Sequence, residues 1–280
     1  MRHYSMRQAG RALTPTGGFL ERFGFSLNPY IGCAFGSAGG CPFCYVRALP
    51  VARAHPGGWG EWVLAKIDLP ERLEVELRSL AAKGRLADTA IFMSSATDPY
   101  QGWERRLGLT RQVLEVLVRY PPRRLLIQTR SPMIERDIDL IGLLRPQAIV
   151  SITLETDDDR VRRTITPTSP SVSRRISTMR RLRAAGISTQ MAIAPMMPND
   201  SEHFAAIAEE AADRVIVDTY FDGDGAKGRR SRSLGMGGFY ERLGYAEWFL
   251  PGAETALLKA LRERLGENRV LFSREGFNAI

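Results

Sequence analysis

The sequence predicts an α/β fold in which parallel strands form a partial (β/α)6 barrel of the TIM type. Short runs rich in β-branched and apolar residues alternate with longer helical patterns along the chain. Such alternation is typical of βα units that build a parallel sheet. The alternation repeats about six times, which favours a barrel, complete or partial, although a doubly wound sheet fits the same periodicity.

Six strands are expected, and the last five look buried on both faces, because their apolar runs lack the polar alternation of a strand with one solvent-exposed face. The first, at about residues 25–32, precedes the cysteines of the chain. The others are predicted at residues 90–95, 124–129, 148–155, 188–195 and 214–221. Polar segments follow all of these strands, so several loops should converge at the strands' carboxyl ends, where α/β folds place their active sites.

Helices are expected between the strands, where apolar residues recur at helical spacing. The clearest are predicted at residues 70–83, 104–120 and 170–186. Asp68 with Glu71 has the pattern of a capping box, and Ser169 before Pro170 has that of an N-cap followed by the first helical residue. The predicted C-terminal caps are glycines, which tolerate a left-handed backbone: Gly84 and Gly186.

The composition is that of an ordinary soluble globular protein, with 44% hydrophobic and 25% charged residues among 280. The basic N-terminal stretch lacks the apolar core of a signal peptide, and no apolar run approaches the ~18 residues that span a membrane. We therefore expect a cytoplasmic protein with no membrane contact. A barrel core is predicted at residues 25–222, between a basic N-terminal extension at 1–24 and a C-terminal extension at 223–280.

All three cysteines, Cys33, Cys41 and Cys44, fall within one short loop after the first predicted strand. An odd number of thiols in one loop is poor material for a disulfide framework, so roles as ligands are favoured. Zinc is one alternative, since Cys41 and Cys44 have the spacing of a zinc knuckle, but a structural zinc site needs four ligands. No histidine stands at a fixed finger spacing; the histidines are His3, His55 and His203.

A thioredoxin-like redox pair is a second alternative, because C-x-x-C also serves that chemistry, although it leaves Cys33 unexplained. An iron–sulfur cluster is the third. Soft thiolates are its ordinary ligands, and a fully protein-held cluster uses four of them. Three thiolates leave one iron open for a substrate or cofactor, as in a catalytic metal site. The cysteine pattern favours this third interpretation.

The motifs around and after the cysteines resemble the radical S-adenosylmethionine (SAM) superfamily, and within it the spore photoproduct lyase-related branch. The resemblance covers about residues 25–220. It rests on many short motifs in the same order: NPYIGC with CPFCYVR, TDPYQGWE, IQTRSP, ERDIDLI, SITLETDD, TPTSPS, LRAAGI and APMMPND. One departure is the cysteine spacing. The family pattern is C-x3-C-x2-C, but seven residues separate Cys33 from Cys41 here, and their glycines could fold out as a bulge.

The resemblance implies a [4Fe–4S] cluster held by Cys33, Cys41 and Cys44, with SAM bound to the fourth iron. It also implies reduction by an external one-electron donor of flavodoxin or ferredoxin type. Reductive cleavage of SAM then gives methionine and a 5′-deoxyadenosyl radical, which abstracts hydrogen from the substrate. In this family the cofactors supply the chemistry, and the protein supplies positioning and exclusion of water.

By position, the resemblance implies that Phe43 packs near the adenine of SAM and that Ala194 offers it backbone contacts. Thr97 and Ser151 would bind polar atoms of SAM, and Arg130 would meet its carboxylate, which a guanidinium fork matches in a bidentate manner. Two strand-end carboxylates could bind ribose or amine groups or simply cap loops: Asp98 and Glu155.

Tyr45 directly follows the third cysteine, where the lyase is thought to use a tyrosine to relay hydrogen; packing beside the cluster is the competing interpretation. The lyase also uses a cysteine after the second strand as a hydrogen donor. This chain has Ser94, Ser95 and Thr97 there, so thymine-dimer repair by that same mechanism is disfavoured.

Lys and Arg together exceed Asp and Glu by 39 to 31, which gives a net charge of +8. Such an excess attracts phosphates. The clearest basic cluster is glycine-rich and follows the last predicted strand; it contains Lys227, Arg229, Arg230 and Arg232. Nucleic acid is therefore a candidate partner, and a non-catalytic iron–sulfur or zinc protein that binds nucleic acid is the alternative to the radical enzyme. The chain shows no compact DNA-reading motif.

Overall fold

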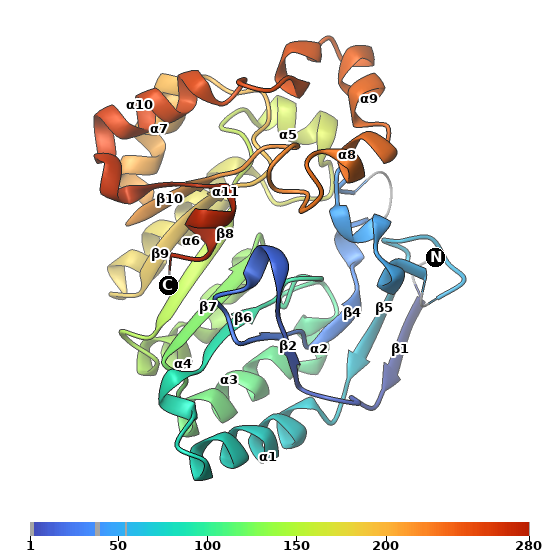
Figure 1. Cartoon of the computed structure of the whole chain (residues 1–280), viewed down its shortest axis with the longest axis vertical. Helices are drawn as coiled ribbons and strands as arrows, with labels where there is room; N and C mark the ends of the chain where they lie inside the picture. Colours follow the sequence, from blue (N-terminus) through green and yellow to red (C-terminus); the bar gives the residue numbers. More distant parts are fainter. Residues whose placement is uncertain (1–2, 37–39, 54, 280) are drawn as a thin grey trace.

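A computed structural model describes residues 3–36, 40–53 and 55–279. Its main sheet has eight strands in the order β11-β10-β9-β8-β7-β6-β3-β2. From β3 to β10 all neighbouring strands are parallel, and helices surround the sheet (Figure 1). These six strands are β3 (Phe25–Leu27), β6 (Ala90–Met93), β7 (Arg124–Thr129), β8 (Ala148–Thr153), β9 (Ser188–Ile193) and β10 (Arg214–Val217).

Each of these six strands lies beside the next one along the chain. This sequential order fits a barrel, because a doubly wound sheet reverses its strand order partway across. The two edge strands, β2 (Leu13–Pro15) and β11 (Val270–Phe272), do not pair with each other in the described part of the chain. The barrel is therefore open, and the predicted partial barrel of parallel strands is confirmed.

Segments from both ends of the chain meet beside the two edge strands, where Figure 1 shows the red helix α11 next to a dark-blue loop. Helix α11 (Ser273–Phe277) follows β11, and the 3-10 turn η1 (Gly18–Leu20) follows β2. The Asn278 amide donates to the Phe19 carbonyl over 2.8 Å. The rings of Phe19 and Phe277 lie 5.5 Å apart. The C-terminal segment thus bridges the open side of the barrel.

The segment predicted as a single first strand, residues 25–32, forms two strands. β3 joins the barrel, whereas β4 (Tyr30–Gly32) pairs with β5 (Trp62–Lys66) in a separate sheet. The break falls at Pro29, which has no N–H to donate to a strand neighbour. The third strand of the small sheet is β1 (His3–Arg7), parallel to β5. The N-terminal residues therefore contribute a strand to each sheet.

The helices lie close to their predicted positions. α1 (Leu69–Ala82) and α6 (Val172–Ala184) match single predicted helices. The remaining predicted helix, residues 104–120, forms two helices, α2 (Glu104–Leu107) and α3 (Leu109–Arg119). The helix is interrupted at Gly108, whose φ is +60°. The remaining helices are α4 (Ile138–Leu143), α5 (Asp159–Ile165), α7 (Ser201–Ala211), α8 (Arg229–Ser233), α9 (Met236–Arg242) and α10 (Thr255–Leu265).

The two predicted N-terminal caps differ from the structure in different ways. Asp68 is the N-cap residue of α1, as predicted, but its side chain makes no capping hydrogen bond. Its carboxylate instead accepts the Ala9 N–H at 2.5 Å and the Arg72 guanidinium at 2.6 Å, since the N-terminal segment packs against it. The N-cap of α6 is Ser171 rather than Ser169. The glycine caps are confirmed by their left-handed φ angles, +68° for Gly84 and +72° for Gly186.

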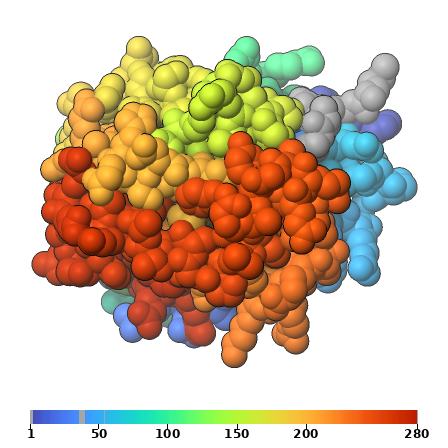
Figure 2. All heavy atoms as spheres, turned by 90° about the horizontal axis from the view of Figure 1, so that it is seen from above, coloured from blue at the N-terminus to red at the C-terminus, as the bar shows by residue number. Residues whose placement is uncertain are grey.

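Apolar side chains cover both faces of the barrel sheet, as the continuous apolar runs predicted. The largest cluster includes residues of the surrounding helices, and a smaller one includes alternate residues of the strands. The C-terminal residues, orange and red, form much of the face seen in Figure 2. Within the described residues, no helix combines the length and the apolar character needed to cross a bilayer.

Candidate functional site

A cavity of about 470 Å³ lies at the carboxyl ends of the barrel strands. Its size is in the range of pockets that bind small ligands. The lining comes from the cysteine loop, the loops after β6, β7, β9 and β10, and the two terminal segments. Eight of the nine site residues predicted from the sequence line it: Cys33, Cys41, Phe43, Cys44, Tyr45, Thr97, Arg130 and Ala194. The exception is Ser151.

The three cysteines are free thiols that face the same cavity. Burial raises the pKa of Cys33 and Cys44 above its usual value and that of Cys41 to about 11, although Arg130 opposes the rise at Cys41. Each thiol also feels the charge of its neighbours. A bound metal centre reverses this preference, because coordination deprotonates a thiol. The donor set therefore consists of three soft ligands grouped at one wall.

Among residues 3–36, 40–53 and 55–279, no set of three His, Cys, Asp or Glu side chains is arranged to hold a single metal ion. A four-iron cluster occupies more space than one ion and takes thiolate ligands. The three cavity-facing thiols fit that larger group, with one coordination position left for a second ligand. The bulge predicted between Cys33 and Cys41 falls largely on residues 37–39, outside the described residues.

The second half of the cysteine loop is a compact turn. The Cys44 N–H donates to the Cys41 carbonyl over 3.1 Å, and the Arg47 side chain donates to the same carbonyl over 3.2 Å. The turn before Cys33 requires a glycine. Gly32 has φ of +85°, and a Cβ placed there would lie 2.3 Å from the Trp62 carbonyl oxygen. Local geometry therefore directs these cysteines toward the cavity.

Arg130 connects the cysteine loop to buried charges. Its Nη1 lies 3.0 Å from Cys41 Sγ and 3.1 Å from Glu155 Oε1. The other Glu155 oxygen accepts from Arg175 over 2.7 Å. Burial opposes ionisation of Glu155, but the two arginines hold the pKa of its carboxyl below the usual value. A cation and an anion thus stand together beside one cysteine.

Thr97 and Asp98 organise the loop after β6. Thr97 Oγ1 donates to the Gly32 carbonyl over 2.5 Å, so it joins this loop to the residue before Cys33. Asp98 accepts the N–H groups of Tyr100 at 2.8 Å and Arg130 at 3.0 Å, as well as a threonine hydroxyl. Asp98 therefore caps loops, as one of its two interpretations held.

Phe43 and Ala194 stand on different loops of the cavity wall, and Phe43 meets the edge of Tyr220 with ring centroids 6.2 Å apart. Ser151 is fully buried within β8 and accepts from the Gln190 amide over 2.9 Å. Two residues nearer the end of the same strand, Thr153 lines the cavity instead. Side chains two apart share a face of a strand, so Ser151 lies one layer below Thr153.

Tyr45 lines the cavity, and its hydroxyl donates to the Ser95 carbonyl. Burial, with the neighbouring Cys44, raises the pKa of the phenol above its usual value. The phenol therefore remains neutral and retains its O–H hydrogen. This geometry is compatible with both of its interpretations, hydrogen relay and packing.

Two further cavity residues were not singled out from the sequence. Asp218 directly follows β10, and burial raises the pKa of its carboxyl to about 7. Gln128, in β7, donates to Thr153, but its buried Oε1 has no hydrogen-bond partner. Asp218 falls inside the last predicted strand, residues 214–221, and only the earlier end of β10 at Val217 places it at the rim of the cavity. Gln128 lies inside an apolar run, and nothing in the sequence marks its orphaned oxygen.

The basic segment after β10 folds around Asp224. This carboxylate accepts the N–H groups of Ala226, Gly228, Arg230 and Ser231 at 2.7–3.1 Å. Of the predicted basic cluster, Arg230 lines the cavity, whereas the others are exposed: Lys227, Arg229 and Arg232. The cavity wall thus carries a cation on the side of β10.

The chain is similar in sequence to proteins of other organisms. The chain is 30% identical over 175 residues to an uncharacterized protein of Methanocaldococcus jannaschii, which covers 62% of this chain and 61% of that protein. It is 28% identical over 213 residues to an uncharacterized protein of Acidianus two-tailed virus, which covers 71% and 66%. The chain therefore matches less than two thirds of the length of these relatives.

The fold is similar to that of spore photoproduct lyase. A structure of that enzyme complexed with dinucleoside spore photoproduct has a TM-score of 0.64, with 96% of this chain and 81% of that chain covered. At 9% identity this likeness concerns the fold alone. The model of the Radical SAM superfamily matches residues 27–211, a span that contains all three cysteines and the strands from β4 to β9. The chain belongs to the radical SAM superfamily.

Proposed function

We propose that Cys33, Cys41 and Cys44 hold a [4Fe–4S] cluster, that SAM binds beside it, and that the protein performs radical chemistry on a substrate in the cavity. The carrying observation is the convergence of the chain's only three thiols on one wall of a ligand-sized cavity. When reduced, the cluster would supply the electron that cleaves SAM to methionine and a 5′-deoxyadenosyl radical. An external donor of flavodoxin or ferredoxin type would provide that electron.

The charges beside Cys41 suit the amino-acid end of SAM. SAM carries a carboxylate at this end, and the Arg130 guanidinium, which lines the cavity and is held from behind by buried Glu155, offers that carboxylate a charged donor. Phe43 and Ala194 would flank the adenine, and Thr97 offers a hydroxyl oxygen. Ser151 would act from one layer deeper in the barrel, below Thr153 on the same face of β8. These residues orient the cofactor and exclude water from the reacting atoms.

The substrate would occupy the remaining wall, formed by Gln128, Asp218 and the aromatic rings near the two termini. The free oxygen of Gln128 accepts hydrogen bonds, and Asp218 accepts or donates according to its protonation. Arg230 adds a positive charge, so a substrate with an anionic or phosphate group fits this side of the cavity. Nucleic acid and small anionic molecules both meet that description.

We expect the reduced, cluster-loaded protein to cleave SAM slowly even without substrate. The test is anaerobic reconstitution, iron and sulfide counts, and detection of 5′-deoxyadenosine by liquid chromatography after addition of dithionite and SAM. Four irons per chain together with product formation support the proposed function. A protein that carries a complete four-iron cluster but binds no SAM contradicts it.

We expect no efficient repair of spore photoproduct. Repair by the mechanism of the lyase needs a thiol after the second barrel strand, but the cavity has Ser94 and Ser95 there, and every cysteine of the chain is a proposed cluster ligand. An alcohol O–H is a far poorer hydrogen-atom donor than a thiol S–H. A defined dinucleotide lesion, incubated with SAM and reductant, would measure this, with the lyase as positive control. Multiple clean turnovers by this chain would overturn the prediction.

A further inference from the structure

The loop of residues 166–171, here called the α5–α6 loop, joins α5 to α6 and reaches the cysteine loop. Thr168 Oγ1 donates to the Phe35 carbonyl over 2.5 Å. Phe35 stands two residues after Cys33, and its own N–H bonds to the Cys33 thiol. A single residue, Phe35, therefore links the hydroxyl of Thr168 to the surroundings of the Cys33 thiol.

The same loop also contacts the second cysteine through Arg130. Ser169 Oγ accepts from Arg130 Nη1 over 3.0 Å, and that nitrogen lies 3.0 Å from Cys41 Sγ. Ser169 is buried, so water does not compete for this hydrogen bond. Two consecutive residues of the α5–α6 loop thus serve the two cysteines that flank the long insertion.

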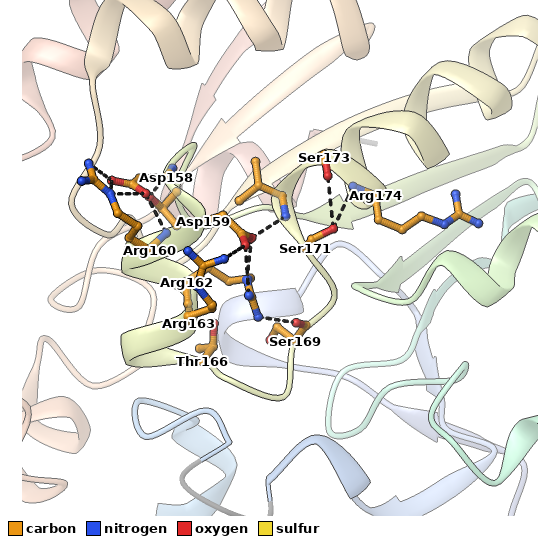
Figure 3. Close-up of polar contacts among 12 residues, drawn as sticks. Asp158, Asp159, Arg160, Arg162, Arg163, Thr166, Ser169, Ser171, Ser173 and Arg174 are labelled. Carbon is orange, nitrogen blue, oxygen red and sulfur yellow. Dashed lines mark hydrogen bonds and ion pairs between the residues drawn. The ribbon is translucent and has the colours of Figure 1, made fainter.

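The α5–α6 loop is itself anchored by a partly buried ion pair, shown in Figure 3. Arg162 binds both carboxylate oxygens of Asp159, at 2.7 and 3.1 Å. Its Nη1 donates to the Ser169 carbonyl over 2.9 Å. Asp159 also accepts the N–H of Val172, the first residue of α6, over 3.1 Å. These contacts fix the path of the loop from both sides.

We propose that the α5–α6 loop is a brace for the cluster-binding loop, in which Thr168 and Ser169 are positioning residues for Cys33 and Cys41. This inference rests on the proposed function, since it assumes a cluster at the cysteines. Seven residues separate those two cysteines in the sequence. A longer, glycine-rich segment loses more conformational entropy when its ends are fixed, so an external contact that holds Phe35 favours assembly.

Replacement of Thr168 tests the brace. Thr168→Val keeps the side-chain shape but removes the hydroxyl that holds Phe35, and Thr168→Ser is the matched control that keeps it. Loss of one such hydrogen bond should make the reconstituted cluster about fivefold more labile to an iron chelator, as for a contact of about 1 kcal/mol. The serine variant should stay within about twofold of the unmodified chain. Iron release is followed by the absorbance of the chelate, without any measurement of activity.

Ser169→Ala adds a readout that a purely structural role would not move. The freed Arg130 guanidinium should shift away from Cys41, and a weaker hydrogen bond to a cluster sulfur makes the reduction potential more negative. Redox titration monitored by electron paramagnetic resonance measures that potential. If Thr168→Val retains its cluster as long as the unmodified chain and Ser169→Ala leaves the potential unchanged, the brace is wrong. If the unmodified chain assembles no cluster, the proposed function fails and the brace fails with it.

Discussion

Replacement of any one of Cys33, Cys41 and Cys44 by alanine should abolish SAM cleavage, with a loss of at least about a thousandfold in the rate of 5′-deoxyadenosine formation. The three thiols face one cavity, and no fourth cysteine exists in the chain to substitute for a lost ligand. A cluster left with two protein ligands would be labile, and the residual iron would no longer present a single open position next to Arg130.

The measurement compares iron, sulfide and 5′-deoxyadenosine in the three single variants and the unmodified chain, all reconstituted anaerobically. Circular dichroism checks that the folded content is unchanged, since each thiol lies in an irregular loop rather than in the main core. Tyr45→Phe is a useful neighbour control, because it removes a cavity hydroxyl but no ligand. If one cysteine variant retains full cleavage activity, that cysteine is not a ligand and the assigned triad is wrong.

Most of the barrel could be predicted because its strands are encoded locally. Apolar runs of strand length recur between helical patterns, and short βα connections leave few alternatives to the sequential strand order observed. Local signals were less informative where tertiary contacts compete. Asp68 has a good capping sequence, but its carboxylate binds the backbone of Ala9 from the N-terminal segment. Gly108 divides a helix that hydrophobic spacing alone predicted as continuous.

The site was predictable at the level of which loops contribute, but not at the level of contacts. Arg130 was expected to face SAM; its contacts with Cys41, Glu155 and Ser169 join three distant segments, and no local pattern encodes them. The depth of a strand residue below the cavity could not be predicted either. Ser151 shares its face with a residue that lines the cavity, and only the position of the sheet relative to the loops decides which of the two does so.

The raised pKa of Asp218 could not be predicted, because it depends on burial by segments that are distant in the sequence. The carboxyl is buried and hydrogen-bonds to Ser273 of the C-terminal segment as well as to the Thr219 N–H. Gly223 also approaches it so closely that a Cβ there would lie 2.3 Å from Oδ2. Burial and the charges of Asp222 and Asp224 raise its pKa from 3.8 to about 7. Perturbed carboxyls of this kind in cavities are frequent at functional sites.

We expect Asp218→Asn to stabilise the protein at pH 8 and to do so much less at pH 5. The folded-state pKa is raised from 3.8 to about 7, so above pH 7 the folded state must hold an unfavourable buried charge, which costs about 4 kcal/mol. As the pH falls through 7 the folded state takes up a proton while the unfolded state remains ionised. The cost then declines and disappears near pH 4. Asparagine avoids the charge at every pH and can still accept the Thr219 N–H.

Asp224→Asn is the matched control, with the opposite sign expected. Burial opposes its ionisation, but four backbone N–H groups hold the pKa of Asp224 below its usual value, so its charge stabilises the folded state at neutral pH. Its removal should destabilise the protein at pH 8 and by a similar amount at pH 5, because both pH values lie above the ordinary pKa of 3.8 and the folded-state pKa is lower still. Urea unfolding of both variants at pH 8 and pH 5 gives the four free-energy differences. Equal urea midpoints for Asp218→Asn and the unmodified chain at pH 8 would contradict this prediction. They would show that water solvates the Asp218 carboxylate in the folded state.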